Sequence, residues 1–144
     1  MTSSGTDAYT VASREDAIDF MADYAEYGEQ RWYTSAIAAE EVSFSWRRML
    51  PGTGGRGSYG HRHPGQEEVY FVISGTVTFK IDDDVFEAGP QTAVRVGGNA
   101  FRSVHNDTDA EARLAIASPR ARGSLRSIDE RRRSCSSESC GSPM

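Results

Sequence analysis

Two of the three histidines in this 144-residue chain lie one residue apart, at the start of the stretch HRHPGQEEVYFVISG, residues 61–75. In an extended segment, residues i and i+2 point to the same face, so His61 and His63 present both imidazoles to one side. A following strand that returns antiparallel can bring Glu68 opposite this pair. Two neutral imidazoles and one carboxylate form a set that suits Fe(II), Mn, Ni or Zn. The other interpretation is a pair of surface histidines beside a loop.

Two tyrosines accompany this candidate metal site. Tyr59 precedes His61 by two residues, and Tyr70 shares a strand face with Glu68. Either hydroxyl could act as an acid or base or orient a substrate, and the alternative is a buried ring with a tethered hydroxyl. The opposite face of the same strand is also apolar and consists of Val69, Phe71 and Ile73. We therefore expect a central strand that is covered on both sides, by an N-terminal helix or by a second subunit.

Alternating short segments predict the scaffold that positions these residues. From residue 42, Val42, Phe44 and Trp46 alternate with Ser43, Ser45 and Arg47, which predicts a half-buried strand with Phe44 and Trp46 in the core. We expect a hairpin at Ser74–Gly75 and a turn at residues 82–84. Further short segments are VFEAG, TAVRV, FRSVHN and ARLAIAS, separated by turn residues. This pattern indicates an all-β barrel or sandwich.

The remaining segments flank the predicted barrel. Residues 1–39 contain SREDAIDFMADYAEYG, a predicted short helix that Ser13 caps and Gly28 ends. Residues 40–119 form the predicted barrel. Residues 120–144 hold six arginines and seven serines with few apolar side chains, so we expect a disordered tail. Its two cysteines, Cys135 and Cys140, are too few for a structural zinc site and are expected to be an exposed pair.

The charge balance and hydropathy limit the classes of partner. Sixteen basic and 21 acidic residues give a formal net charge of −5, which argues against a nucleic-acid partner. The first twenty residues lack a basic region followed by an apolar run, and no stretch is long enough to cross a membrane. We therefore expect a cytoplasmic protein without a membrane partner.

The spacing of GHRHPGQEEVYFVISG resembles the first motif of the cupin superfamily, namely HxH, four residues, Glu, six residues and Gly. His61, His63, Glu68 and Gly75 fit these positions. The resemblance covers about residues 40–118 and is strongest to small single-domain bacterial cupins, often labelled as similar to mannose-6-phosphate isomerase. It implies a double-stranded β-helix, also called a jelly-roll barrel, with a metal held inside by three histidines and one glutamate.

The chain departs from the family in the second motif, AGPQTAVRVGGNAFRSVHN. Alignment on Asn106 puts Arg102 where the family has its third histidine, and His105 falls on the opposite face of the strand. Arginine has no lone pair for a metal, so the metal is expected to be weakened or absent. Three outcomes remain open: Arg102 swings aside, it holds an anionic substrate group against the metal, or it pairs with Glu68 and no metal binds.

Three functional hypotheses follow. The first is a metal-dependent enzyme acting on a carboxylated or sugar-like molecule, with Arg102, Tyr59 and Tyr70 binding the substrate and no catalytic residue assigned. The second is a non-enzymatic cupin that binds a small, anionic or sugar-like molecule. The third is a structural role in which the barrel interior is inert. In each case we expect a homodimer.

Overall fold

The structure is a computed structural model that describes residues 4–5, 8–54 and 61–120. Tyr59, the two cysteines and the predicted tail from residue 121 onward lie outside the described residues.

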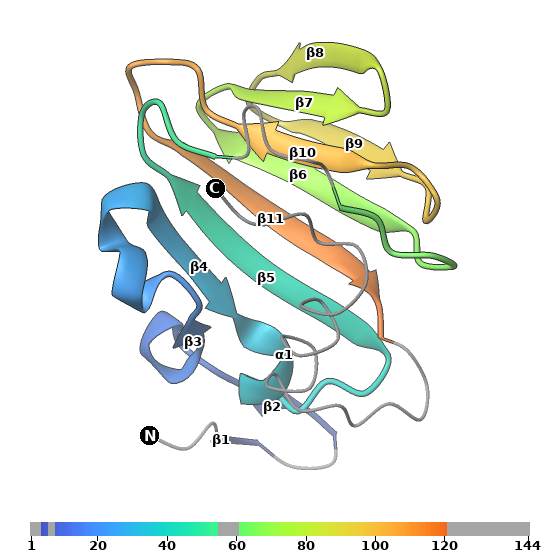
Figure 1. Cartoon of the computed structure of the whole chain (residues 1–144). Coiled ribbons are helices and arrows are strands. Elements are labelled where there is room, and N and C mark those ends of the chain that lie inside the picture. The colour runs from blue at the N-terminus through green and yellow to red at the C-terminus, as the bar shows by residue number, and fades with distance from the viewer. Residues whose placement is uncertain (1–3, 6–7, 55–60, 121–144) are drawn as a thin grey trace.

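Two antiparallel sheets form the body of the protein (Figure 1). The larger sheet has the strand order β3 (Ile18–Asp19), β4 (Gly28–Trp32), β5 (Val42–Met49), β11 (Ala112–Pro119), β6 (Glu68–Ser74) and β9 (Thr92–Val96). The smaller sheet has the order β10 (Arg102–His105), β7 (Val77–Ile81) and β8 (Asp84–Ala88). A separate pair joins β1 (Ser4–Gly5) to β2 (Thr10–Val11). This arrangement confirms the predicted all-β jelly-roll barrel.

The hydrophobic core lies between the two sheets. Val72 of β6, Phe79 of β7 and Leu114 of β11 are each 0% exposed. The same cluster contains Met49, Tyr70, Val77, Ala88, Val94, Val96, Val104 and Ala112. β6 pairs with β11 on one side and β9 on the other, so its predicted central position in a sheet is confirmed. The predicted cover by an N-terminal helix is wrong, because Val69, Phe71 and Ile73 on its outer face are 36–38% exposed.

The inward face of β5 is the polar one. Ser43 and Ser45 are 8% and 5% exposed, whereas Val42 and Phe44 are 51% and 38% exposed. The strand was predicted correctly, but the prediction that Phe44 lies in the core is wrong, and Trp46 shares its outward face. Alternation defines which residues share a face and leaves open which face is buried.

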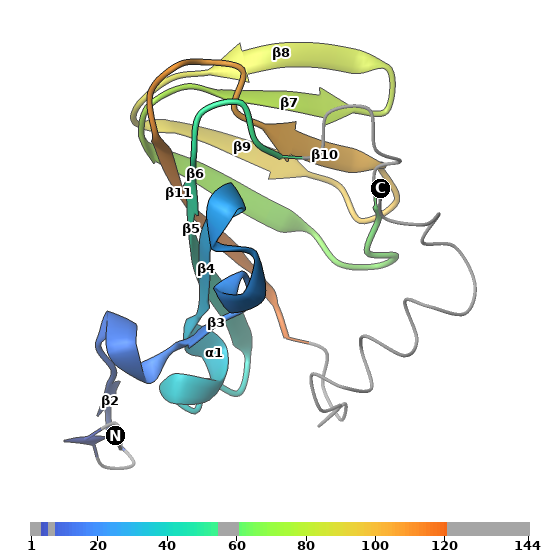
Figure 2. The same ribbon diagram turned by 60° about the vertical axis from the view of Figure 1, so that its left-hand side comes forward.

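The N-terminal segment forms two 3-10 helices, Arg14–Asp16 and Ala22–Tyr27, with β3 between them. The expected capping occurs, because the Ser13 backbone amide donates to the Asp16 carboxylate over 2.9 Å. A continuous helix does not form, since the residues at 18–19 pair with β4 instead. These elements and the short helix α1 (Tyr33–Ala36) gather around β4, at the opposite end of the molecule from β8 (Figure 2).

The turn after β6 leads from one sheet to the other. β6 pairs with β11 and β9, and β7 pairs with β10 and β8, so the hairpin predicted at Ser74–Gly75 is wrong. Gly75 has φ +77°, and a Cβ there would lie 2.5 Å from the carbonyl oxygen of Glu111. The corner therefore requires glycine for both its conformation and its close contact with the end of the neighbouring loop.

No helix among the described residues is long and apolar enough to span a membrane.

Candidate metal and ligand site

Three side chains from the first motif converge at one end of the barrel. The ligand atoms of His61, His63 and Glu68 all lie within 4.8 Å of one another. The imidazole rings meet edge to face, with centroids 4.9 Å apart. The sequence therefore identified correctly the residues that could hold a metal.

Backbone contacts fix the segment that carries the histidines. His61 and Arg102 exchange two backbone hydrogen bonds, of 3.0 and 2.9 Å, so the segment is attached to β10 rather than to β6. A turn follows, in which the amide of Gln66 donates to the carbonyl of His63. Gly98 lies against this turn, because a Cβ there would come within 2.6 Å of the Gln66 nitrogen. The bend brings both imidazoles back over the start of β6, where Glu68 lies.

The Glu68 carboxylate uses its two oxygens differently. Oε1 accepts a hydrogen bond from the Tyr70 hydroxyl and a second, of 3.4 Å, from Nη1 of Arg102. Oε2 lies 4.0 Å from Nε2 of His63. The carboxylate is 12% exposed, and the His63 side chain is 44% exposed. One oxygen is thus held by the protein, and the other is directed toward the histidines.

Arg102 is fully buried beside this carboxylate. Its Nη2 donates to the carbonyl oxygens of Gly97 and Ala100, over 2.7 and 3.0 Å. Together with the bond to Glu68, these contacts hold the guanidinium inside the protein. Of the three outcomes considered for Arg102, the geometry shows the pairing with Glu68, and the loss of metal that was expected to accompany it stays a prediction.

Burial and neighbouring groups shift the pKa values of Tyr70 and His61. Burial raises the pKa of Tyr70, and Glu68 raises it further. The phenol therefore stays protonated and donates a hydrogen bond to the Glu68 carboxylate. Burial and the adjacent His63 lower the pKa of His61, and the charges of Arg102 and Arg47 act in the same direction. His61 is therefore neutral at neutral pH and has a lone pair available for a metal.

The donor set fits a divalent metal with three protein ligands. Two imidazole nitrogens and the Oε2 of Glu68 converge, which matches a 2-His-1-carboxylate site with open positions. The fourth position of the family is taken by Arg102, whose charge opposes a cation. The residues present therefore fit a metal that is held more weakly than by a four-ligand set.

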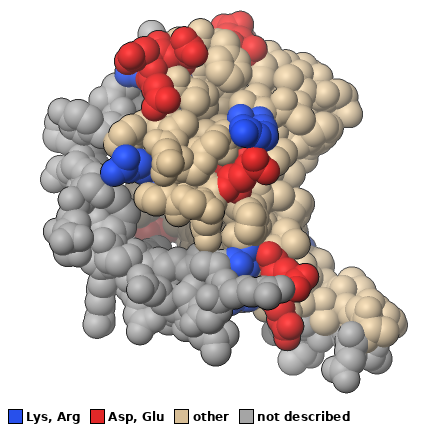
Figure 3. Space-filling model, turned by 90° about the vertical axis from the view of Figure 1, so that its right-hand side faces the viewer, with Lys and Arg blue, Asp and Glu red and all other residues tan. Residues whose placement is uncertain are grey.

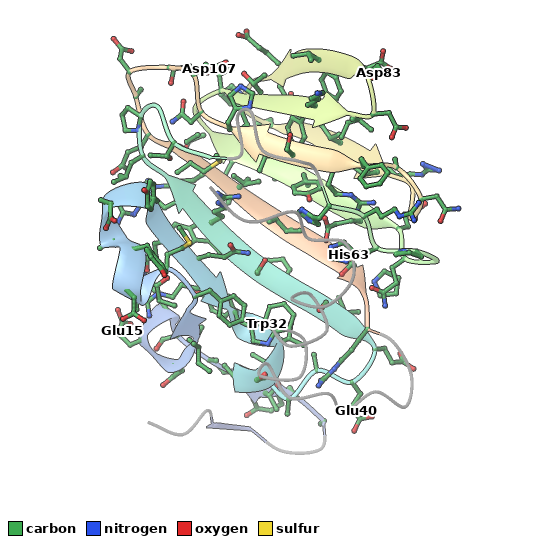
Figure 4. All side chains as sticks on the ribbon, in the orientation of Figure 1. Glu15, Trp32, Glu40, His63, Asp83 and Asp107 are labelled. Carbon is green, nitrogen blue, oxygen red and sulfur yellow. The ribbon has the colours of Figure 1, made fainter. Side chains whose placement is uncertain are left out.

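The two other polar residues of the second motif serve the fold. His105 is 8% exposed, and its Nε2 lies 2.8 Å from Oδ2 of Asp107. Figure 4 shows Asp107 far from His63, so His105 does not complete the metal site. Asn106 is 1% exposed and donates to three backbone carbonyls, those of Met49, Leu50 and Ala110.

One polar residue near the site was missed by the sequence analysis. Arg47 is on the inward face of β5, opposite Leu114 of β11, and its charge acts on both Tyr70 and His61. The signal was present in the alternation of Ser43, Ser45 and Arg47. It was assigned to the solvent face because polar residues usually lie there.

The surface at this side of the molecule carries few charges. Figure 3 shows acidic and basic side chains singly or in neighbouring groups, with no extended basic area on the visible face. An exposed ion pair joins Arg95 and Glu67 over 2.8 Å.

Comparison with known families agrees with the geometry. The profile of a family described as "Cupin domain" (Cupin_2) matches residues 47–117. No curated protein matches the sequence.

Several solved structures share the fold. A cupin protein from Bacteroides fragilis has 19% sequence identity and a TM-score of 0.64, with 85% of this chain and 92% of that chain covered. A sugar phosphate isomerase of the cupin superfamily from Silicibacter pomeroyi has 18% identity and a TM-score of 0.60, covering 83% and 69%. A putative sugar phosphate isomerase from Acidithiobacillus ferrooxidans has 20% identity and a TM-score of 0.57. That alignment covers 65% of this chain and 61% of that protein.

Proposed function

Because the chain is a cupin-domain protein, we propose that its barrel binds a small anionic or sugar-like molecule beside a weakly held divalent metal on His61, His63 and Glu68. The observation that carries this proposal is the convergence of three ligand atoms within 4.8 Å at the end of the barrel. When bound, a divalent metal would supply Lewis-acid polarisation of a ligand oxygen.

The protein's own residues give this site its character. Tyr70 and Arg102 fix one oxygen of Glu68, which leaves the other oxygen oriented toward the histidines. The open positions of a three-ligand set would be available to the bound molecule. The names of two structural neighbours make sugar phosphates the first molecules to test.

Metal uptake tests this proposal directly. Protein purified without a histidine tag, stripped with a chelator and titrated with Mn(II), Fe(II), Ni(II) or Zn(II), should take up one ion per chain. Arg102→His should raise the affinity roughly tenfold or more, because it adds a lone-pair donor and removes a positive charge. His63→Ala should abolish uptake.

His105→Gln is the matched control, since His105 bonds to Asp107 outside the site, and this variant should bind metal as the wild type does. Absence of uptake by both the wild-type protein and Arg102→His would contradict the metal site. Uptake that survives in His63→Ala would place the metal elsewhere.

A second candidate, a metal-free binding cupin, is favoured by one observation. Arg102 is 0% exposed and lies 3.4 Å from Glu68, so its guanidinium supplies an internal positive charge close to the proposed metal position. In this case Arg102→His would acquire metal that the wild-type protein does not bind, while small-molecule binding by the wild type would need no metal.

We also propose that the outer face of the larger sheet is the interface of a homodimer. Val69, Phe71 and Ile73 of β6 are 37%, 36% and 38% exposed. Across β11, Val42 and Phe44 of β5 extend the same apolar face. Burial of these side chains against a second copy would remove them from water. Sedimentation should give the mass of a dimer for the wild type and of a monomer for Phe71→Glu.

A further inference from the structure

The inward face of β5 carries a row of polar side chains inside the barrel. Ser43, Ser45 and Arg47 follow one another on this face, and the two serines are 8% and 5% exposed. The row faces the same interior as the candidate metal site, because Ile116 of β11 pairs with Ser45 on one side and with Tyr70 of β6 on the other. Only one strand separates the two sets of polar residues.

This row has no partners in the part of the chain that the structure describes. Among the described residues, none forms a hydrogen bond or ion pair with the Arg47 guanidinium, and none accepts from or donates to the hydroxyls of Ser43 and Ser45. Burial lowers the pKa of Arg47, which reflects the cost of holding its charge away from water. Polar side chains that line the interior and have no partner among the described residues have hydrogen-bonding groups available to a ligand.

Arg102 and Arg47 differ in this respect. Both terminal nitrogens of Arg102 are bonded, to Glu68 and to the carbonyls of Gly97 and Ala100, and only its buried Nε has no partner among the described residues. Arg47 has no such partner, yet its charge reaches Tyr70 and His61. Within the described part of the chain, Arg47 is thus an inward-facing cation whose terminal nitrogens have no protein partner.

We propose that Arg47, with Ser45 and Ser43, binds the anionic end of the ligand, so that the molecule is a small hydroxylated compound with one phosphate or carboxylate group. The guanidinium would hold the anion through paired hydrogen bonds, and the serines would contact hydroxyl groups. β5 and β6 are two strand spacings apart, about 10 Å. Because the side chains of both strands extend into this space, the distance between their polar ends is roughly the length of a five- or six-carbon sugar derivative. This inference rests on the proposed function, because the other end of the molecule would lie at His61, His63 and Glu68.

Calorimetric titration of the metal-loaded protein with glucose 6-phosphate, gluconate, glucose and inorganic phosphate tests the inference. We expect one of the two hydroxylated anions to bind more tightly than glucose or phosphate. The phosphate and carboxylate arms distinguish the two kinds of anion. Arg47→Gln should weaken this binding about 30-fold, since a charge-assisted contact is lost. Arg95→Gln, which removes a 65% exposed arginine, should bind as the wild type does.

The empty protein provides an independent readout. An unpartnered, partly buried charge is costly, so Arg47→Gln should raise the melting temperature by about 3 °C in the absence of ligand. A purely structural arginine would lower it. Arg47→Lys keeps the charge without the planar fork and should bind with intermediate affinity. It serves as the test variant if Arg47→Gln does not fold.

The possible outcomes distinguish failure of this inference from failure of the proposed function. Equal affinity in the wild type and Arg47→Gln, with metal uptake intact, overturns the inference alone. Glucose binding as tightly as its phosphate, or metal uptake without binding of any probe, also overturns only the assigned ligand class. Failure of the wild type to bind either metal or any probe overturns both.

Discussion

Glu29, which is buried, and Glu68, which is partly buried, are each paired with arginine, but their two carboxylate oxygens accept hydrogen bonds to different degrees. Glu29 is 3% exposed. One of its oxygens accepts from Arg14 over 2.7 Å and from Arg48 over 3.4 Å, and the other accepts from Arg31. Both oxygens are therefore used by the protein, and the cluster ties the N-terminal segment to β4 and β5.

Glu68 has only one oxygen occupied in this way. Oε1 accepts from Tyr70 and Arg102, and Oε2 has its nearest ionic contact at 4.0 Å, with His63. A fully bonded carboxylate, in which both oxygens accept hydrogen bonds from the protein, contributes to stability. A half-bonded carboxylate, in which only one oxygen does so, is held in a fixed orientation and has its other oxygen available to a ligand. The comparison agrees with a structural role for Glu29 and supports the proposed ligand role of Glu68.

The largest expected loss of stability comes from replacing Glu29, whose carboxylate is fully bonded. Glu29→Gln should lower the free energy of unfolding by about 3 kcal/mol, because it leaves three arginines without their shared anion. Denaturant unfolding measures this loss. Glu111→Gln is the matched control, since Glu111 also contacts two arginines but is 40% exposed, and it should cost about 0.5 kcal/mol or less. Equal losses in both variants would contradict the structural role of Glu29.

A somewhat smaller loss of folding stability is expected when the pH is lowered. The hydrogen bond from Arg14, with help from Arg31 and against the effect of burial, lowers the pKa of Glu29 from 4.5 to about 2. A depressed pKa stabilises the folded state above the unfolded value, and this stability is lost as the pH falls through the folded value. Wild-type protein should therefore lose about 2 kcal/mol between about pH 5 and pH 2 through this group.

Unfolding curves of the wild type and Glu29→Gln across this range isolate that contribution. The stability difference between the two proteins should shrink steadily as the solution is acidified. A difference that stays constant down to pH 2 would mean that the Glu29 carboxylate is not the group responsible.

The sequence predicted which side chains converge as candidate metal ligands because the relevant information is local. His61, His63 and Glu68 lie within eight residues, and a single bend is enough to bring their side chains together. The loss of the fourth ligand could also be predicted, since it depends only on the identity of residue 102. How Arg102 pairs depends on the carbonyls of the loop before β10, and no sequence pattern specifies these contacts.

The orientation of β5 could not be predicted for a different reason. Period-two alternation separates Phe44 from Ser45 correctly, and the usual rule then buries the apolar face. This strand reverses the rule, because Ser45 is 5% exposed and Phe44 is 38% exposed. The proposed polar ligand would lie against a polar lining, and the proposed dimer interface would need an apolar exterior. The two proposals together would account for a strand whose polar face is the buried one.

The smallest expected effect on stability concerns Glu68, and it distinguishes the two carboxylates most sharply. Glu68→Gln should lower the free energy of unfolding by only about 1 kcal/mol, because Arg102 keeps its bonds to two backbone carbonyls. The same variant should lose metal uptake, since an amide oxygen is a poor replacement for the carboxylate that faces the histidines.

Glu67→Gln is a control from the adjacent residue, because Glu67 is 55% exposed and pairs with Arg95. It should retain both metal uptake and stability. If Glu68→Gln instead destabilised the protein as much as Glu29→Gln and still bound metal, both carboxylates would be structural. The distinction between a fully bonded and a half-bonded glutamate would then carry no functional meaning.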